Sequence, residues 1–288
     1  MTSAEFAALD RLIPLALEED LGAAGDLTSR ALIPPDLIGR AAIVVRVPGT
    51  LAGLPAARRV CAQVDPAIVF TEIVPDGTIL NGPTTVAEVS GPMASILTAE
   101  RTALNFLQRL SGVASKTRTY TRLIADLPVK LLDTRKTTPG WRLLEKYAVR
   151  CGGGHNHRLG LYDGVLIKDN HLAALGSRRL SPSEAIGRAR AHYGHTVSIE
   201  VEVDTLDQLT EVLGADPDIV LLDNMSIELL RRAVAMRNTI APKIPLEASG
   251  GVTLDTLRAI AETGVDRISV GALTHSAVSL DIALDYLP

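Results

Sequence analysis

The chain has 288 residues, which exceeds the roughly 100 to 200 residues of a typical domain, so two domains or one large barrel are expected. Aromatic residues make up only 3% of a sequence that is 47% hydrophobic, so aliphatic side chains must fill the core, which favours an α/β protein. The formal net charge of -4 argues against a nucleic-acid-binding protein, because such proteins carry strongly basic surfaces.

The sequence also limits the compartment and the type of partner. Cys61 and Cys151 are too few for a disulfide framework and indicate a reducing environment. Residues 1–22 lack the basic-then-apolar order of a signal peptide, and no run approaches the ~20 apolar residues of a membrane span. We therefore expect a cytoplasmic protein that acts on small molecules and has no membrane or nucleic-acid partner.

The first part of the chain predicts helices around a small sheet. Apolar residues over 6–17 recur at helical spacing, with Pro14 bending or interrupting the helix. Short β-rich runs at 42–47, 68–74 and 85–89 are separated by turn signals and predict a mainly antiparallel sheet. A long helix is expected to begin near Thr98, a suitable N-cap, and to weaken at Gly112, where we place the domain boundary.

Short apolar runs alternate with helical segments after residue 128, and this pattern predicts a parallel sheet. The runs cover 129–132, 164–167, 197–203, 219–222, 245–248 and 267–270. Such strands with helices between them can close, or nearly close, into a TIM-like barrel. The predicted fold is therefore α/β, with an N-terminal domain over 1–112 and a barrel domain over 113–288 whose last helix can pack back on the first domain.

Basic side chains follow the predicted strands, at the end where parallel barrels carry their sites. They are Arg135, Lys136, His157, Arg158 and Lys168. Arginine grips a carboxylate or phosphate with paired hydrogen bonds, and lysine adds a compact charge, so the set suits a multiply anionic ligand. The alternative is ordinary solvated charge.

Acidic side chains form a second set on neighbouring strands. Glu200, Glu202 and Asp204 alternate and so share one face of a strand, and Asp223 ends the next strand. Carboxylates of this kind suit magnesium, which leaves its other positions to phosphates and water. The alternative is that the acids simply pair with the basic set.

Glycine-rich turns follow the last two predicted strands, at Ser249, Gly250 and Gly251 and again at Gly271. Backbone N–H groups in such turns can hold a phosphate, which barrels often bind after their last strands. His155 and His157 do not predict a zinc site, because no cysteine spacing accompanies them and the adjoining cations would repel a metal.

These motifs resemble the quinolinate phosphoribosyltransferases, the carboxylating nicotinate-nucleotide pyrophosphorylases, over nearly the whole chain. The segments that carry the resemblance are 98–105, 133–139, 152–159, 166–171, 200–204, 221–224 and 247–251. The resemblance implies an N-terminal α/β sandwich domain followed by an incomplete barrel. It also implies that quinolinate reacts with phosphoribosyl pyrophosphate to give nicotinate mononucleotide, pyrophosphate and carbon dioxide, in the biosynthesis of NAD.

The resemblance further implies roles for individual residues. The expected catalytic residues are Lys136, Lys168, Glu202 and Asp223, and Glu202 and Asp223 would also hold Mg2+. The expected substrate-binding residues are these four together with Arg101, Arg135, His157, Arg158, Ser249, Gly250 and Gly271. The working unit would be a homodimer in which Arg101 crosses into the neighbouring subunit's site.

Three alternatives remain open at this point. The first is a molybdate-associated pyrophosphorylase, which shares the barrel but need not bind quinolinate. The second is a Schiff-base lyase that uses Lys168, because a lysine ending a barrel strand can attack a carbonyl. The third is a protein that binds anions without catalysis.

Overall fold

The computed structural model describes residues 1–174 and 180–288, and it divides the chain into two compact units. Unit 1 comprises Met1–Thr119, Lys136–Gly154 and Ala272–Pro288, and unit 2 comprises Tyr120–Arg135 and His155–Gly271. The chain therefore leaves unit 1 and returns to it more than once, whereas the sequence suggested consecutive domains that meet at residue 112.

Unit 1 is built on a four-stranded antiparallel sheet with the order β12-β1-β5-β3, and on a separate two-stranded sheet of β2 and β4. Its elements are α1 (Ser3–Leu21), α2 (Leu27–Leu32), β1 (Ile38–Val45), β2 (Gly49–Thr50), α3 (Leu54–Val64), β3 (Val69–Glu72), β4 (Ile79–Leu80), β5 (Thr84–Pro92), α4 (Met93–Leu123), α5 (Arg142–Cys151), α11 (Ala272–His275) and β12 (Ile282–Leu287). The antiparallel sheet agrees with the prediction, and the last helix, α11, lies in unit 1.

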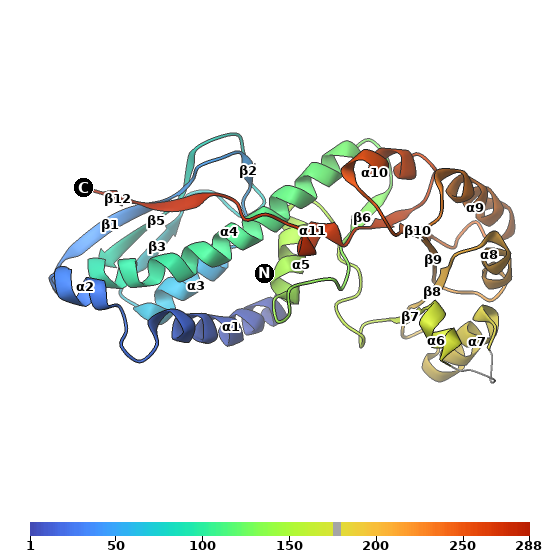
Figure 1. The fold of residues 1–288 in the computed structure, drawn as a ribbon, viewed down its shortest axis with the longest axis horizontal. Coiled ribbons are helices and arrows are strands. Elements are labelled where there is room, and N and C mark those ends of the chain that lie inside the picture. Colours follow the sequence, from blue (N-terminus) through green and yellow to red (C-terminus); the bar gives the residue numbers. More distant parts are fainter. Residues whose placement is uncertain (175–179) are drawn as a thin grey trace. The chain divides into compact units, whose positions relative to one another are not determined.

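Helix α4 runs along the four-stranded sheet and buries one face against it (Figure 1). Ile43 of β1 and Val89 of β5 line a small cavity together with Ile96 and Ala103 of α4, so these elements share one core. All four residues are at least 97% buried, with exposed fractions of 2%, 3%, 3% and 3% respectively. Burial of this apolar face outweighs the modest helix propensity of the β-branched residues.

The predicted limits of this long helix were wrong at both ends. Thr98 is not an N-cap, because α4 begins at Met93 and the Thr98 hydroxyl donates to the carbonyl oxygen of Ala94 one turn earlier. Gly112 does not weaken the helix either, since α4 continues to Leu123. A Cβ atom at position 112 would lie 2.1 Å from the carbonyl oxygen of Val278, so glycine is needed there to let another backbone pass.

The backbone that passes Gly112 leads into β12, a strand that the sequence did not predict. The amide of Leu280 donates to the carbonyl oxygen of Gln108, and the Gln108 side chain donates to the carbonyl oxygen of Ile282. Ile282 then pairs with Val45 of β1 at the start of an antiparallel ladder. The C-terminal segment thus becomes an edge strand of the first sheet.

Unit 2 contains a six-stranded sheet with the order β6-β11-β10-β9-β8-β7, and every pair in it is parallel. Its elements are β6 (Lys130–Leu132), β7 (Val165–Ile167), α6 (Asp169–Ala173), α7 (Pro182–Tyr193), β8 (Ile199–Val203), α8 (Leu206–Leu213), β9 (Ile219–Asp223), α9 (Ile227–Ile240), β10 (Leu246–Ser249), α10 (Leu254–Ala261) and β11 (Arg267–Ser269). All six predicted strands are present. The edge strands β6 and β7 are not paired with each other in the described residues, so the barrel is incomplete.

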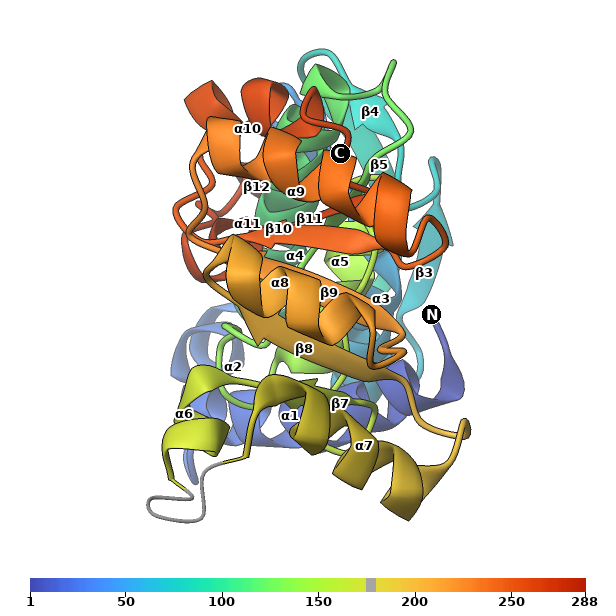
Figure 2. The same cartoon turned by 90° about the vertical axis from the view of Figure 1, so that its right-hand side faces the viewer.

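The helices of unit 2 cover one face of its sheet, and the other face carries Glu200, Glu202 and Glu247 beside apolar residues such as Leu221. Figure 2 shows α8, α9 and α10 side by side in front of the strands. Threonine or serine caps begin them soon after the strands end: Thr205 caps α8, Ser226 caps α9 and Thr253 caps α10. These caps keep the loops at the carboxyl ends of the strands short and well defined.

Among the residues that the structure describes, no helix is long and apolar enough to cross a lipid bilayer.

The close approach at Gly112 predicts that Gly112→Ala destabilises the protein. The added methyl group must displace the backbone at Val278, and overpacking of this kind costs about 1 to 3 kcal/mol. Gly187→Ala in α7 is the matched control, because a Cβ there has no neighbour within 4 Å and alanine is the better helix former. Urea unfolding should show opposite shifts for the two variants, and equal shifts would contradict the packing role of Gly112.

Candidate active site

The carboxyl ends of the unit 2 strands bring several predicted site residues to one rim. Lys168 directly follows β7. Glu202 of β8 pairs with Leu221 of β9, so Asp223, two residues after Leu221, lies closer to the rim than Glu202 does. Asp223 in turn pairs with Ser249 of β10. Because all these strands are parallel, their polar ends meet at the same edge of the sheet.

Lys168 and Glu202 form an ion pair across neighbouring strands β7 and β8. The Lys168 side chain is 41% exposed, whereas that of Glu202 is 10% exposed, so the lysine reaches toward solvent from a carboxylate that is largely buried. Glu200, two residues earlier on the same strand, is only 4% exposed. The structure therefore separates two glutamates that the sequence did not distinguish, because Glu202 lies at the rim and Glu200 lies deeper.

Behind the rim, His157 is held between two buried carboxylates. Its Nε2 atom lies 3.1 Å from Oε2 of Glu200 and 3.3 Å from Oε1 of Glu247. The other oxygen of Glu247 accepts a hydrogen bond of 2.7 Å from Nε of Arg267, which is its register partner on β11. The result is a buried chain of alternating charge and hydrogen bonds that crosses several strands.

Burial opposes a charge on His157, but hydrogen bonds and the charges of Glu200 and Glu247 outweigh it and raise the pKa of His157 to about 9. The same carboxylates keep a proton on Nε2. On the other side of the ring, Nδ1 accepts a hydrogen bond of 2.7 Å from the backbone N–H of Arg158. A second proton on Nδ1 would break this contact, so the Arg158 N–H opposes the rise in pKa, and in this conformation the ring is neutral, donates from Nε2 and accepts at Nδ1.

Asp133 fixes the segment that carries His157. Its buried carboxylate accepts hydrogen bonds from the His157 backbone N–H at 2.9 Å and from the Asn156 side chain at 2.6 Å. His155 forms a parallel bridge with Leu132, so the segment lies along β6 as a short extension of the sheet. A buried carboxylate with good donors is well compensated, and it holds residues 155–157 in place.

Arg135 and Arg158 lie close enough for their charges to interact. Burial and the neighbouring charge of Arg135 lower the pKa of Arg158, while the charge of Glu200 opposes this effect. The Arg158 guanidinium also donates to the carbonyl oxygen of Gly164 at 3.0 Å. Two guanidinium groups near one buried carboxylate leave a net positive charge, which favours an anionic ligand.

The glycine turn after β10 has the geometry that a phosphate cradle requires. Gly250 adopts a positive φ of 92°, and a Cβ atom there would lie 2.1 Å from the side-chain oxygen of Asn224. Gly251 also has a positive φ, of 61°. Both glycines are exposed, and Gly271 follows β11 at the same edge of the sheet. Glycine-rich turns of this kind can bind an anion through their backbone N–H groups.

Two predicted residues lie in unit 1. Lys136 is exposed, and its carbonyl oxygen accepts a hydrogen bond of 2.8 Å from the Thr274 hydroxyl. Arg101 lies on α4 with a side chain that is 60% exposed, and its guanidinium is 3.9 Å from Glu100. Both side chains are therefore open to solvent.

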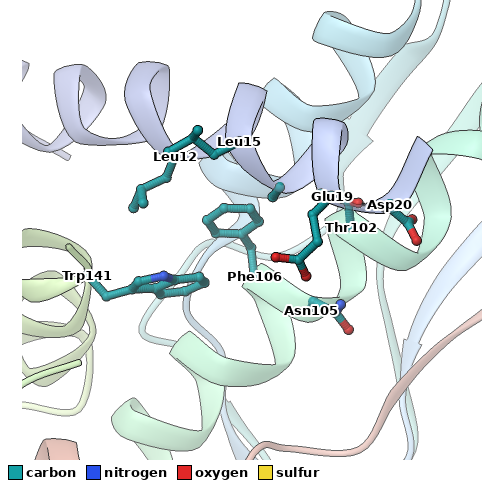
Figure 3. A pocket seen from close by; sticks show the side chains of 9 residues that line it. Leu12, Leu15, Glu19, Asp20, Thr102, Asn105, Phe106 and Trp141 are labelled. Atoms are coloured by element: carbon teal, nitrogen blue, oxygen red, sulfur yellow. Dashed lines mark hydrogen bonds between the residues drawn. The ribbon is translucent and has the colours of Figure 1, made fainter. Parts of the chain in front are cut away.

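Unit 1 also contains a hollow of about 380 Å³ between α1, α4 and Trp141 (Figure 3). Phe106 stacks on Trp141 with ring centroids 4.7 Å apart, and these rings form part of its apolar wall. Glu19 and Asp20 line another part. An acidic lining does not suit a multiply anionic ligand, so charge places the candidate site in unit 2.

The sequence analysis assigned no role to Glu247, Arg267 or Asp133. Glu247 lies in the run 245–248, which was interpreted only as an apolar strand. The signal was present, since a glutamate in the middle of a strand expected to be buried must find a partner. The partner was not visible, because it depends on which strands are neighbours in the sheet.

Comparison with known proteins agrees with this architecture. The family model "Quinolinate phosphoribosyl transferase, N-terminal domain" matches residues 26–111, and the model "Quinolinate phosphoribosyl transferase, C-terminal domain" matches residues 113–285. The chain belongs to the quinolinate phosphoribosyltransferase family.

Relatives and solved structures of the family match over nearly the whole chain. A probable carboxylating nicotinate-nucleotide pyrophosphorylase of Bacillus subtilis is 44% identical over 96% of this chain and 93% of the relative. The carboxylating nicotinate-nucleotide pyrophosphorylase of Mycobacterium leprae is 42% identical over 99% of both chains. The structure of the nicotinate-nucleotide pyrophosphorylase from Francisella tularensis superposes with a TM-score of 0.91 at 41% identity, covering 98% of this chain and 96% of that one.

Two groups of side chains in this quinolinate phosphoribosyltransferase offer metal ligands. Glu202 and Asp223 present oxygen atoms at the rim, and these suit a hard cation such as magnesium. The trio of His157, Glu200 and Glu247 also has ligand atoms within 4.8 Å of one another. Arg267 already bonds one oxygen of Glu247 in that trio, as Lys168 bonds Glu202 at the rim, so a cation at either place would have to displace a basic group.

Proposed function

We propose that this member of the quinolinate phosphoribosyltransferase family transfers the phosphoribosyl group of phosphoribosyl pyrophosphate to quinolinate. The products are nicotinate mononucleotide, pyrophosphate and carbon dioxide, in the biosynthesis of NAD. The observation that carries the proposal is the rim at which Lys168 pairs with Glu202, in a unit that also holds Arg135 beside Arg158. Both substrates are multiply anionic, and a cationic site with separate carboxylates suits them.

The cations would bind and orient the reactants. Arg135 and Arg158 present planar guanidinium groups, which match the two carboxylates of quinolinate. Lys168 can exchange its bond to Glu202 for a substrate anion, because its side chain is 41% exposed. The turn at Gly250 would hold a phosphate through its backbone N–H groups. We assign Lys136 to the same anionic substrates.

The first chemical step exchanges one bond for another at the ribose. The quinolinate nitrogen forms a bond to C1 while the bond from C1 to pyrophosphate breaks, and the leaving oxygen keeps that electron pair. Positive charge grows on C1 as the bond breaks, and Glu202 or Asp223 at the rim would stabilise it. No protein nucleophile is needed, so positioning and electrostatics supply the rate enhancement.

The second step releases carbon dioxide. The new bond leaves the ring nitrogen positively charged, so it withdraws electrons from the neighbouring carbon. The bond from that carbon to its carboxylate breaks, carbon dioxide leaves, and the carbon takes up a proton. The cationic surroundings of Arg135 and Arg158 would hold the second carboxylate in place meanwhile.

We propose magnesium as the metal, held by Glu202 and Asp223. The support is the chemistry of the donors, two carboxylates from neighbouring strands β8 and β9 at one rim. When bound, magnesium would neutralise charge on the pyrophosphate.

The ion pair between Lys168 and Glu202 disfavours a Schiff-base lyase. An ammonium group that is bonded to a carboxylate has no free electron pair, so it does not attack a carbonyl. This quinolinate phosphoribosyltransferase would therefore use Lys168 for charge rather than for covalent catalysis.

The proposed reaction predicts that labelled carbon dioxide is released from carboxyl-labelled quinolinate only when phosphoribosyl pyrophosphate and magnesium are both present. Pyrophosphate should form in equal amount, because each turnover breaks one bond of each kind. Omitting each component in turn provides the controls. Release without phosphoribosyl pyrophosphate, or binding of quinolinate without any turnover, would contradict the proposal.

Arg135→Ala is expected to raise the KM for quinolinate. Loss of a paired, charged contact should cost about 2 to 5 kcal/mol of binding free energy. Lys130→Ala is the matched control, since Lys130 is exposed and begins β6, whereas Arg135 follows its other end. Steady-state kinetics with both variants measures the effect, and an unchanged KM in Arg135→Ala would exclude this placement.

We also propose a homodimer in which Arg101 completes the neighbouring subunit's site. The exposed guanidinium of Arg101 supports this role, because it is available to a second molecule. Mixing inactive Arg101→Ala and Lys168→Ala subunits should then restore about a quarter of the wild-type activity, since half of the dimers are hybrids with one intact site. Subunits that exchange fully and remain inactive would show that Arg101 acts within its own chain.

A further inference from the structure

Both nitrogens of the His157 ring contact protein groups. Nε2 lies between Glu200 on β8 and Glu247 on β10, and Nδ1 accepts the backbone N–H of Arg158. The side chain is 9% exposed. The ring therefore connects two strands that are not neighbours, because β9 lies between them, to the backbone of a residue in the anionic site.

Glu247 occupies the centre of this arrangement. It is fully buried. One of its oxygens accepts a hydrogen bond of 2.7 Å from Nε of Arg267, and the other, Oε1, lies 3.3 Å from Nε2 of His157 in an ion-pair contact without a hydrogen bond. Burial raises the pKa of Glu247, but its contacts with His157 and Arg267 outweigh burial and lower it. The carboxylate is thus ionised and oriented from both sides.

Stability alone does not account for a carboxylate at this position. Buried ion pairs are often no more stable than apolar side chains of similar volume, because each charge must first lose its water. A buried charged group of this kind is better explained by the orientation that it imposes on its partner.

We propose that Glu247 is a positioning residue for the quinolinate site, where it fixes the His157 ring together with Glu200 and thereby sets the backbone at Arg158. This inference rests on the proposed function. It adds that His157 acts through Arg158, and that the chain of contacts runs from Arg267 through Glu247 and His157 to the guanidinium that binds substrate. Glu247 itself touches neither substrate.

The charges near Arg158 explain why the orientation of the His157 ring matters for substrate binding. The charges of Arg135 and Arg158 repel each other, and Glu200 counters that repulsion. Glu200 is in turn held by Nε2 of His157. If the ring turns, Glu200 loses its donor and Arg158 loses the acceptor of its backbone N–H, so the two guanidinium groups are no longer held in one arrangement.

Glu247→Gln tests the proposal with almost no change in volume. A glutamine has one oxygen and one NH2 group, so either orientation places NH2 against a donor, either His157 or Arg267. Equilibrium binding of labelled quinolinate to the variant should weaken by about tenfold to a hundredfold, since a buried donor loses its acceptor. The KM for phosphoribosyl pyrophosphate should change less than quinolinate binding, because the contacts of Glu247 lead to His157 and Arg158 rather than to the glycine turn that follows its strand.

Two further glutamate variants serve as comparisons. Glu262→Gln changes a surface pair with Arg258 and should bind quinolinate as the wild type does. Glu200→Gln should also weaken quinolinate binding, because it removes the charge that counters the repulsion of Arg135 and Arg158.

A double-mutant cycle distinguishes positioning through His157 from general damage. If Glu247 acts through the ring, Glu247→Gln should weaken quinolinate binding much less in a His157→Asn background than in the wild type. Independent, additive losses would overturn the proposal, as would equal losses for quinolinate and phosphoribosyl pyrophosphate. If Glu247→Gln does not unfold cooperatively, Arg267→Lys replaces it in the same measurements, with the same expected separation of the two substrates.

The result also separates this inference from the proposed function. If the wild-type protein neither binds quinolinate nor releases carbon dioxide, the proposed function is wrong. If the wild-type protein is active and Glu247→Gln binds quinolinate normally, only the positioning role of Glu247 is wrong.

Discussion

The register of the parallel sheet in unit 2 is the constraint on which the rest of the site depends. Hydrogen bonding between strands sets Glu202 level with Leu221 and Asp223 level with Ser249, so polar groups from separate strands reach one rim. A shift by a single residue would turn these side chains to the face that the helices cover. The apolar packing of the helices holds the strands in this register, so the helices stabilise the site indirectly.

Charge compensation organises the site around that register. Lys168 is held by Glu202 at the rim, and His157 is held by Glu200 and Glu247 behind it. The exposed pair can exchange partners when an anionic substrate arrives, because water and substrate both reach the lysine. The buried pairs cannot do so, since breaking them would leave uncompensated charges in a medium of low dielectric constant. One set of ion pairs is therefore suited to binding and the other to orientation.

Close packing of backbone segments holds the elements of unit 1 together, whereas strand register arranges the site residues of unit 2. Helix α4 continues without a break at Gly112. The missing side chain there leaves room for the backbone of the segment at Val278. Arg109, one turn earlier, binds the buried carboxylate of Glu145 and donates to the carbonyl oxygens of Thr274 and Ala277. These contacts lead the chain from α11 into β12 and so bring the C-terminus back to the first sheet.

The sequence by itself determined the α/β class, all six strands of the parallel sheet and the polar residues at their ends, including Lys168 and Asp223. It could do so because strand periodicity, caps and turn residues are local signals. The tertiary structure alone decided the partners of buried groups. Glu247 meets His157, Glu200 lies deeper than Glu202, and Gly112 serves a close crossing rather than a helix end. Each of these depends on which distant strands and segments become neighbours, and burial of apolar area in three dimensions determines that choice.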